Sequence, residues 1–548
     1  MTPRDLREHL VALEQNKLLH RVTREINKDT ELSPLVRWQF RGLRQRDRFG
    51  FLFERVMDSR GISYTIPVVS SVYGPSHRVM AIGMGCEVAE INPRWAAAVR
   101  EPIAPIMVSD GPCQEVVHQG TTLTEHGGLL EFPFPIYTPG FDPGPYTSAS
   151  HWISKNPSNG VRNVGNYRAQ IKSQTRTGLF HHPGAHMRAH WLKARARRQP
   201  LPAALMIGTA PAITYSAVSH VGADLDELAI AGALIGEPVE LVRCVSIDLE
   251  VPALAEIVIE GHVSTEYMEP EAPFGEYLGY QGQRCWGYVF DVTAITHRRD
   301  PILATVVSQM PPSEASVMST LRRSAGLYNH LTRVRGFSNV KGVDIPEWAS
   351  GFCYIVIRVG REPGPDVKEI LEAAAASDRT IGRVLVAIDD DIDGHDAEAV
   401  NWSMCWRVEP HRDVRIIHDR ESSLDCLPVS PPEMPLVGYF FPLPGQPTSS
   451  LLIDATRKRP YPPVSLPARP YMERARELWV AEGLPTLEPK SIWHGYDLGA
   501  WGDLDRMQAE RAVEGRYLET GEWALGQRRM IDDLQSPEPG APPAHVPK

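Results

Sequence analysis

Residues 255–263 read AEIVIEGHV, and this stretch decides the fold class of the chain. Runs of similar, β-favouring composition occur at residues 240–249 (ELVRCVSIDL), 287–295 (GYVFDVTAI) and 302–307 (ILATVV). Proline and glycine turns separate these runs. Short strands at this spacing predict an antiparallel sheet that is curled into a barrel-like or split form.

Helical patterns flank this region on both sides. Residues 4–15 (RDLREHLVALEQ) place leucines at helical spacing, which predicts an amphipathic helix. Beyond the sheet, the apolar runs 353–359 (CYIVIRV) and 383–388 (RVLVAI) bracket a helical run at 366–377. Fully apolar strands that alternate with a helix are typical of a parallel sheet. We therefore expect a second α/β domain after the central sheet.

The composition excludes several classes of protein. The chain has 548 residues, 42% hydrophobic and 23% charged, so a disordered chain is excluded and three or four domains are expected. A net charge of −10 argues against nucleic acid as the partner. The N-terminus has no apolar signal-peptide core, and no apolar run is long enough for a membrane span. The seven cysteines form no CxxC pair. These features predict a cytoplasmic enzyme that binds neither membrane nor nucleic acid.

Two carboxylates lie in the segment EAPFGE, at Glu271 and Glu276. Pro273 and Gly275 prevent a regular strand or helix between them, so both acids could face one cleft. Two acids in a dry pocket raise one pKa, which provides a proton donor near neutral pH. The alternative is a turn with solvent-exposed acids.

A second polar segment reads NVGNYR and contains Asn163 and Arg168. The arginine offers a bidentate fork for a carboxylate or a phosphate. The alternative for this segment is a solvated edge strand.

Four histidines follow at spacings that imitate a metal site on a helix: His181, His182, His186 and His190. The Pro-Gly pair at 183–184 interrupts a helix, so one of these histidines is a better candidate ligand than all of them. The basic run at 193–198 is a solvated face or a contact for a polyanionic substrate tail.

Taken together, these segments resemble the UbiD family of reversible decarboxylases, which use a prenylated flavin mononucleotide (prFMN). The resemblance covers roughly residues 4–485 in the family's order. It is carried by DLREHLVALEQNKLL, RNVGNYRAQ, LPAALMIGTAP, ELAIAGALIGEPVELVRC, VPALAEIVIEG, EAPFGEY, DDDIDGHDAEAVNW and LLIDATRK.

The resemblance implies a mixed α/β (α+β) architecture. It places an N-terminal α/β domain at 1–115, a split β-barrel that binds prFMN and carries catalysis at 116–325, and a C-terminal α/β oligomerisation domain at 326–490. A C-terminal extension with a flexible tail follows at 491–548. Family members are homo-oligomers, dimers or hexamers, in which a C-terminal helix crosses to a neighbour.

The resemblance also assigns the site. The implied catalytic residues are Arg168, Glu271 and Glu276. The implied ligands of a metal ion, Mn²⁺ or Mg²⁺, are Asn163, His186 and Glu227, and with Arg168 they also bind the cofactor. His181 stays open as an alternative to His186, and a K⁺ ion is expected nearby.

The implied reaction is the non-oxidative, reversible decarboxylation of an aromatic or α,β-unsaturated acid. In it prFMN is the electron sink and Glu276 is the proton donor. A flavin prenyltransferase would supply the cofactor. An aromatic acyl-CoA substrate, such as a phthaloyl-type thioester, stays open because of the basic run at 193–198. The alternatives are a catalytically silent scaffold of the same fold and a metal-dependent hydrolase built on the histidines at 181–190.

Overall fold

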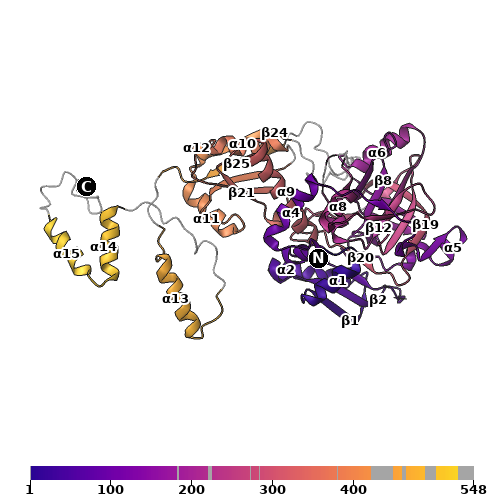
Figure 1. Cartoon of the computed structure of the whole chain (residues 1–548), viewed down its shortest axis with the longest axis horizontal. Helices are drawn as coiled ribbons and strands as arrows, with labels where there is room; N and C mark the ends of the chain where they lie inside the picture. The colour runs from indigo at the N-terminus through magenta and orange to yellow at the C-terminus, as the bar shows by residue number, and fades with distance from the viewer. Residues whose placement is uncertain are drawn as a thin grey trace. The chain divides into compact units, whose positions relative to one another are not determined.

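A computed structural model gives the fold of the chain (Figure 1). It describes residues 2–181, 184–219, 222, 225–271, 273–282, 284–378, 381–420, 448–459, 464–487 and 502–528. The chain forms two compact units, Met1–Asp390 with Ser403–Ala455, and Asp391–Trp402 with Thr456–Lys548. None of the described helices combines the length and the apolar character needed to cross a membrane.

The N-terminal region of the first unit is a small α/β layer. Helix α1 (Leu6–Gln15) begins at Asp5, whose carboxylate caps the helix by accepting from the Glu8 N–H at 2.8 Å. The sheet has the order β1 (Leu19–Asn27), β2 (Gly50–Met57), β4 (Val68–Ser70) and β20 (Leu303–Thr305), with β3 (Ser63–Tyr64) also on β2. The accompanying helical elements are α2 (Leu32–Gly42), η1 (Gln45–Asp47), α3 (His77–Gly83), η2 (Val88–Glu90) and α4 (Ile91–Arg100).

The central region is a curled, ten-stranded sheet in the described part of the chain. Its order is β7 (Tyr146–Thr147), β10 (Ala169–Ser173), β11 (Arg176–Leu179), β19 (Cys285–His297), β15 (Ile257–Val263), β12 (Leu201–Ile207), β8 (His151–Lys155) and β9 (Arg162–Asn166). Strands β6 (Val116–Gln119) and β16 (Glu269–Glu271) add to β19. The pairings within this sheet are antiparallel, as the sequence predicts.

The central strands are buried on both faces. Along β12, Ala203 and Leu205 contribute to one hydrophobic core, whereas Ala204 and Met206 contribute to another. Because side chains alternate between the faces of a strand, each face of the sheet packs against its own core. This explains why an antiparallel strand reads as a continuous apolar run.

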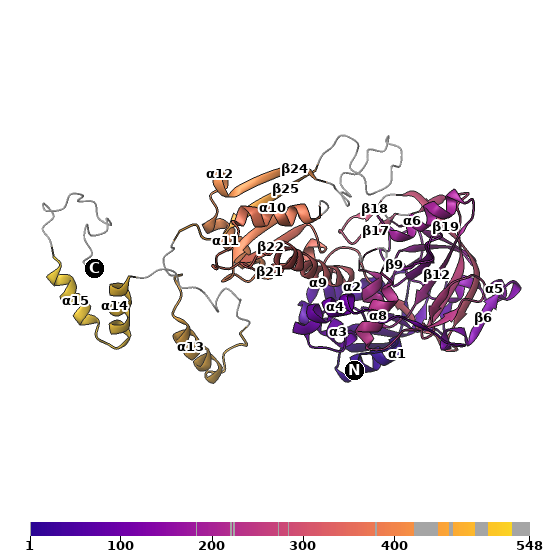
Figure 2. The ribbon, with the colours of Figure 1, turned by 45° about the horizontal axis from the view of Figure 1, so that its top comes forward.

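Helices and a small sheet cover the second of these cores. The helices are α7 (Pro211–Ala217) and α8 (Glu227–Ile235). Helix α6 (His186–Ala196), which lies beside the curled sheet in Figure 2, packs Met187, Trp191 and Ala194 into the first core instead. The small sheet has the order β14 (Glu250–Pro252), β13 (Glu240–Arg243) and β5 (Ile106–Met107). The remaining elements of this region are η3 (Pro112–Gln114), α5 (Thr121–Glu125), η4 (Gly128–Glu131) and the ribbon of β17 (Phe274–Gly275) with β18 (Gln281–Gly282).

Two of the four β-rich runs lie outside the curled sheet, contrary to expectation. The run at 240–249 forms β13 in the small sheet, and the run at 302–307 forms β20, which pairs in parallel with β4 of the N-terminal sheet. Local periodicity identifies a strand but does not name its partner, since any buried sheet accepts the same apolar pattern.

The C-terminal region of the first unit is the expected α/β layer. Its sheet has the order β21 (Val340–Asp344), β22 (Tyr354–Val359), β23 (Val384–Asp389), β25 (Thr448–Ala455) and β24 (Val414–Arg420). The three inner strands are parallel, and both edge strands are antiparallel. Its helical elements are α9 (Glu314–Asn329), the π-helical turn η5 (His330–Val334), η6 (Glu347–Ala349), α10 (Val367–Ser377) and α12 (Pro410–Asp413), and α11 (Ala397–Arg407) runs from the second unit into the first.

The second unit contains α13 (Arg469–Ala481), α14 (Asp503–Val513) and α15 (Tyr517–Gly526). None of these three helices buries a residue. The helical pattern at residues 471–483 of the sequence predicts the first of them. The other two, which lie in the expected C-terminal extension, are not predicted. The tail expected to be flexible, at 536–548, lies outside the described residues.

Candidate active site

Arg168 joins both carboxylates of the EAPFGE segment. Its Nε donates to Glu271 Oε1 at 2.9 Å and its Nη2 donates to Glu271 Oε2 at 2.7 Å, which makes a bidentate pair. Its Nη1 donates to Glu276 Oε1. The side chains are 9%, 0% and 11% exposed for Arg168, Glu271 and Glu276, so the three charges share a nearly dry environment.

Three separate elements position these side chains. Arg168 lies in the short link between β9 and β10. Glu271 ends β16, which pairs with β19, whereas Glu276 directly follows β17, which pairs with β18. The chain changes its pairing partner between the two acids, and the Glu276 N–H then donates to the Tyr280 carbonyl at 2.8 Å in a tight turn. This change of partner brings two acids that are five residues apart to one guanidinium.

Two glycines leave the space that Glu271 occupies. A Cβ on Gly287 would lie 2.6 Å from Glu271 Cβ, and a Cβ on Gly178 would lie 3.3 Å from Glu271 Cγ. Gly287 is on β19 and Gly178 is on β11, which are neighbouring strands. Any side chain at Gly287 would therefore displace the carboxylate of Glu271.

Aromatic rings hold the guanidinium from two sides. Arg168 Cζ lies 4.5 Å from the centre of the Phe180 ring and 5.1 Å from that of Phe274. Tyr146 packs behind Phe274 with ring centroids 4.4 Å apart. Cation–π contact and the two acids together fix the orientation of the guanidinium.

The thiol of Cys285 lies beside the same carboxylate. Its Sγ is 4.0 Å from Glu271 Oε2. Burial, followed by the charge of Glu271, raises the pKa of Cys285 to about 12, so this thiol stays neutral at physiological pH.

A second polar group lies at the start of two helices. Asn163 is on β9, His186 is the first residue of α6, and Glu227 is the first residue of α8. Asn163 Oδ1 and His186 Nδ1 are 3.2 Å apart. The Val164 N–H donates to Glu227 Oε2 at 2.9 Å. Helix N-termini favour anions, so a phosphate also suits this place.

This second group lacks a counter-charge in the described part of the chain. Burial raises the pKa of Glu227 to about 7, and no described cation forms an ion pair with it. Asn163 Nδ2 is buried and has no hydrogen-bond partner among the described residues. A buried carboxylate, an amide and an imidazole form a donor set that suits Mn²⁺ or Mg²⁺.

The other histidines of this run lie apart from one another. The His181 ring is buried and stacks on Tyr288 at 4.0 Å. His190 bonds through Nδ1 to Ser154 Oγ at 3.0 Å. His182 lies outside the described residues. Of the described histidines in this run, His186 is the one in contact with Asn163. The described histidines of the run do not form a shared zinc site.

Comparison with known proteins fits this geometry. The family model of the UbiD 3-octaprenyl-4-hydroxybenzoate carboxy-lyase Rift-related domain matches residues 106–311. The model of the corresponding C-terminal domain matches residues 316–455. The chain belongs to the UbiD family.

Solved structures extend the UbiD match over most of the chain. An evolved dimeric form of the UbiD-class enzyme HmfF from Pelotomaculum thermopropionicum, in complex with prFMN, is 31% identical with a TM-score of 0.72, covering 85% of this chain and 97% of that chain. The vanillic acid decarboxylase of Sedimentibacter hydroxybenzoicus, in an open form, is 26% identical with a TM-score of 0.71, covering 87% and 100%. The 3,4-dihydroxybenzoic acid decarboxylase of Klebsiella pneumoniae, at 22% identity and a TM-score of 0.71, shares the fold.

Membership of the UbiD family confirms the predicted family, the mixed α/β fold and the class of carboxy-lyase. The roles of the individual site residues stay predictions. The sequence did not single out Phe180 as a site residue, whereas Cys285 ends the loop at 281–285 that is expected to shape the pocket. Phe180 reaches Arg168 because its N–H donates to the Arg168 carbonyl at 3.3 Å, a pairing that residue spacing does not reveal.

Proposed function

We propose that this UbiD-family chain catalyses the non-oxidative, reversible decarboxylation of an aromatic or α,β-unsaturated carboxylic acid. The observation that supports this most is the buried set of one guanidinium and two carboxylates around Arg168. The decarboxylases that resemble it act on vanillic acid and on 3,4-dihydroxybenzoic acid.

Arg168 holds the carboxylate of the substrate in this proposal. Glu271 occupies Nε and Nη2, so the guanidinium keeps its orientation while Nη1 exchanges Glu276 for the substrate. Glu271 stays paired with the arginine and balances its charge in the dry site. The guanidinium therefore positions the scissile carboxylate without rearranging.

Glu276 is the acid of the reaction. When bound, prFMN supplies the electron sink for the electron pair that remains when CO₂ leaves. Released from Arg168, the Glu276 carboxylate takes up a proton from solvent and delivers it to the carbon that has lost CO₂. In the reverse direction the same carboxylate removes that proton. A positioned general acid contributes about 10²–10⁴ in rate.

Asn163, His186 and Glu227 would hold the metal ion and the phosphate end of the cofactor. The unpartnered Asn163 amide nitrogen and the buried Glu227 carboxylate support this assignment. We infer Mn²⁺ or Mg²⁺ from the oxygen-rich donor set, with a K⁺ ion nearby, and Arg168 as a further contact of the cofactor. The cation would neutralise both Glu227 and the phosphate.

We infer a free aromatic acid rather than a CoA thioester as the substrate. The basic residues near the end of α6 have local partners: Lys193 donates to Asn156 Oδ1 at 3.0 Å, and Arg195 lies over the Trp191 ring at 5.4 Å. These contacts support a solvated face.

We further infer a flavin prenyltransferase as the cofactor supplier and a homo-oligomer as the working form. Helix α13 exposes Tyr471, Leu478 and Val480 and buries no residue, which supports a contact between copies.

The test is production of the chain together with a flavin prenyltransferase, followed by an absorption spectrum and a screen for CO₂ release. Free aromatic acids, cinnamate-like acids and aromatic acyl-CoA esters form the panel. We expect a flavin-loaded protein that releases CO₂ from at least one free acid. A loaded protein that is inert on the whole panel would indicate a silent scaffold. A colourless, flavin-free protein would contradict the proposed cofactor.

A further inference from the structure

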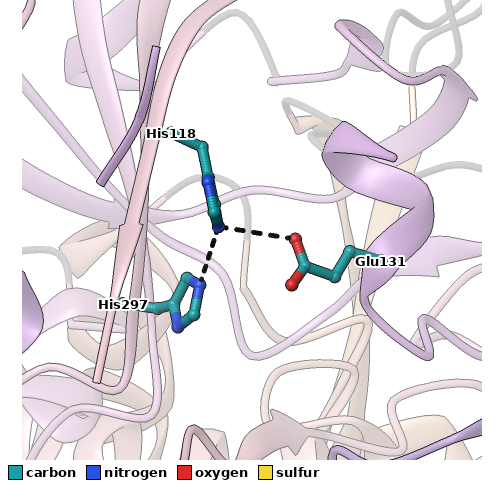
Figure 3. A group of neighbouring side chains, drawn as sticks. All are labelled: His118, Glu131 and His297. Carbon is teal, nitrogen blue, oxygen red and sulfur yellow. Dashed lines mark hydrogen bonds and ion pairs between the residues drawn. The ribbon is translucent and has the colours of Figure 1, made fainter. Parts of the chain in front are cut away.

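Three side chains outside the proposed active site converge from distant parts of the chain. His118 is on β6, Glu131 ends η4, and His297 ends β19 (Figure 3). Their ligand atoms all lie within 4.8 Å of one another. His118 and His297 are 7% and 5% exposed. This group, called the His–Glu–His cluster below, has no part in the proposed decarboxylation.

The hydrogen bond of His297 determines where its lone pair lies. His297 Nδ1 is 2.6 Å from the Arg298 carbonyl oxygen. A carbonyl oxygen only accepts, so Nδ1 carries the hydrogen and donates it. The other ring nitrogen, Nε2, is therefore the one that can offer a lone pair to the cluster. Metal-binding histidines are commonly oriented in this way, by donating the other ring N–H to a carbonyl.

The spacing of the cluster suits one cation. His118 Nε2 lies 3.3 Å from His297 Nε2 and 3.8 Å from Glu131 Oε2. Tetrahedral ligands about 2.0–2.1 Å from a zinc ion are roughly 3.3–3.4 Å from one another. Small side-chain movements would bring all three atoms to that separation.

Hydrogen bonds alone do not satisfy the three atoms. A proton on His118 Nε2 can serve His297 Nε2, but the Glu131 carboxylate is too distant for a hydrogen bond to the same ring. Glu131 Oε2 is buried and has no hydrogen-bond partner in the described part of the chain. One divalent cation would be bound by both imidazoles and this carboxylate oxygen at once.

We propose that His118, Glu131 and His297 bind a zinc-class divalent cation and leave one coordination position open to water. Two imidazoles and one carboxylate are a donor set that zinc accepts. The cation links the η4 turn to the end of β19. Strand β19 also pairs with β6, where His297 lies opposite Val116. The bound cation therefore stabilises the segment that connects β6 to η4.

The test measures bound Zn²⁺ in the purified full-length chain after equilibration with micromolar free Zn²⁺. The parent is compared with Glu131→Gln, which keeps the shape of the side chain, and with His118→Ala. The matched control is His262→Ala, a half-buried histidine on β15 of the same sheet. Measuring the difference between proteins removes any contribution from Asn163, His186 and Glu227.

We expect each cluster variant to bind one equivalent of Zn²⁺ less than the parent, and the control to bind as much as the parent. We also expect Zn²⁺ to raise the unfolding temperature of the parent by more than that of Glu131→Gln. A folded Glu131→Gln variant that retains the full Zn²⁺ content and the full thermal shift would overturn the proposal. So would a parent that binds no Zn²⁺.

Discussion

Glu271 and Glu227 are both buried acids of the central region, but their surroundings differ in one respect. Glu271 is held by two hydrogen bonds from Arg168 and is fully buried. Glu227 accepts from a backbone N–H, and burial raises its pKa to about 7. The protein itself neutralises the first carboxylate. The second has no ion-pair partner among the described residues, which is consistent with the metal ion proposed above.

The largest effect is expected when the cationic partner of Glu271, the guanidinium of Arg168, is removed. In Arg168→Leu, both Glu271 and Glu276 lose the guanidinium, and an unpaired buried charge costs about 3–5 kcal/mol. We expect a large fall in the free energy of unfolding, measured by denaturant titration, and no CO₂ release.

The matched control for this substitution is Arg176→Leu. Arg176 pairs with Glu269 at 3.3 Å, but its side chain is 45% exposed. An exposed pair contributes at most about 1 kcal/mol, so this variant should stay close to the parent. Equal stability losses in both variants would contradict the distinction between the two pairs.

A third buried acid, Glu314, extends the comparison because it too forms no ion pair with any residue that the structure describes. Its Oε1 accepts from the N–H groups of Tyr73 and Gly74 at 2.8 and 2.9 Å, and burial raises its pKa from 4.5 to about 7. A raised folded pKa adds stability below the unfolded value, and this is lost as the pH rises through about 7. The Glu314→Gln variant, whose amide oxygen can accept the same bonds, has no such dependence.

We therefore expect the parent to lose stability relative to Glu314→Gln between pH 5 and pH 8, by at most about 3 kcal/mol. Unfolding temperatures of both proteins across this pH range measure the difference. A constant difference would show that Glu314 keeps one protonation state throughout.

Displacing Glu271 without changing any charge is a smaller perturbation. In Gly287→Ala, the new methyl group would lie 2.6 Å from Glu271 Cβ, and such overpacking costs about 1–3 kcal/mol. We expect reduced stability and a lower turnover number. Gly326→Ala in α9 is the control, because nothing lies within 4 Å of its added Cβ. Undiminished turnover in Gly287→Ala would mean that the position of Glu271 matters little.

The mildest change removes the charge of Glu227. Glu227→Gln keeps an oxygen for the Val164 N–H, so the fold should persist. Because ligand charge sets the affinity for hard cations, we expect Mn²⁺ affinity to fall by roughly tenfold or more, measured by equilibrium dialysis. Glu237→Gln, an exposed acid just beyond the same helix, serves as the control. Unchanged Mn²⁺ affinity in Glu227→Gln would remove Glu227 from the metal site.

The sequence predicts the antiparallel curled sheet and the C-terminal α/β layer, because strand periodicity and apolar runs are local properties. It misplaces the strands at 240–249 and 302–307, since the choice of partner depends on long-range packing. The meeting of Arg168 with Glu271 and Glu276 follows from a change of pairing partner near Pro273. The Pro and Gly positions indicate a bend there but do not name its target.

The sequence does not predict which aromatic rings and glycines surround the site. Phe180 carries no pattern in the sequence that links it to Arg168. The space at Gly287 is likewise visible only once β16 lies against β19. The His–Glu–His cluster brings together residues 118, 131 and 297, a combination that no local motif suggests.

The most direct test of the proposed decarboxylation is CO₂ release by the cofactor-loaded Glu276→Gln variant, with Glu269→Gln, at the start of β16, as the control. If Glu276 is the proton donor, the first variant binds the cofactor but loses about 10²–10⁴ in turnover, whereas the control stays near the parent. CO₂ release by Glu276→Gln at the parental rate would contradict the account.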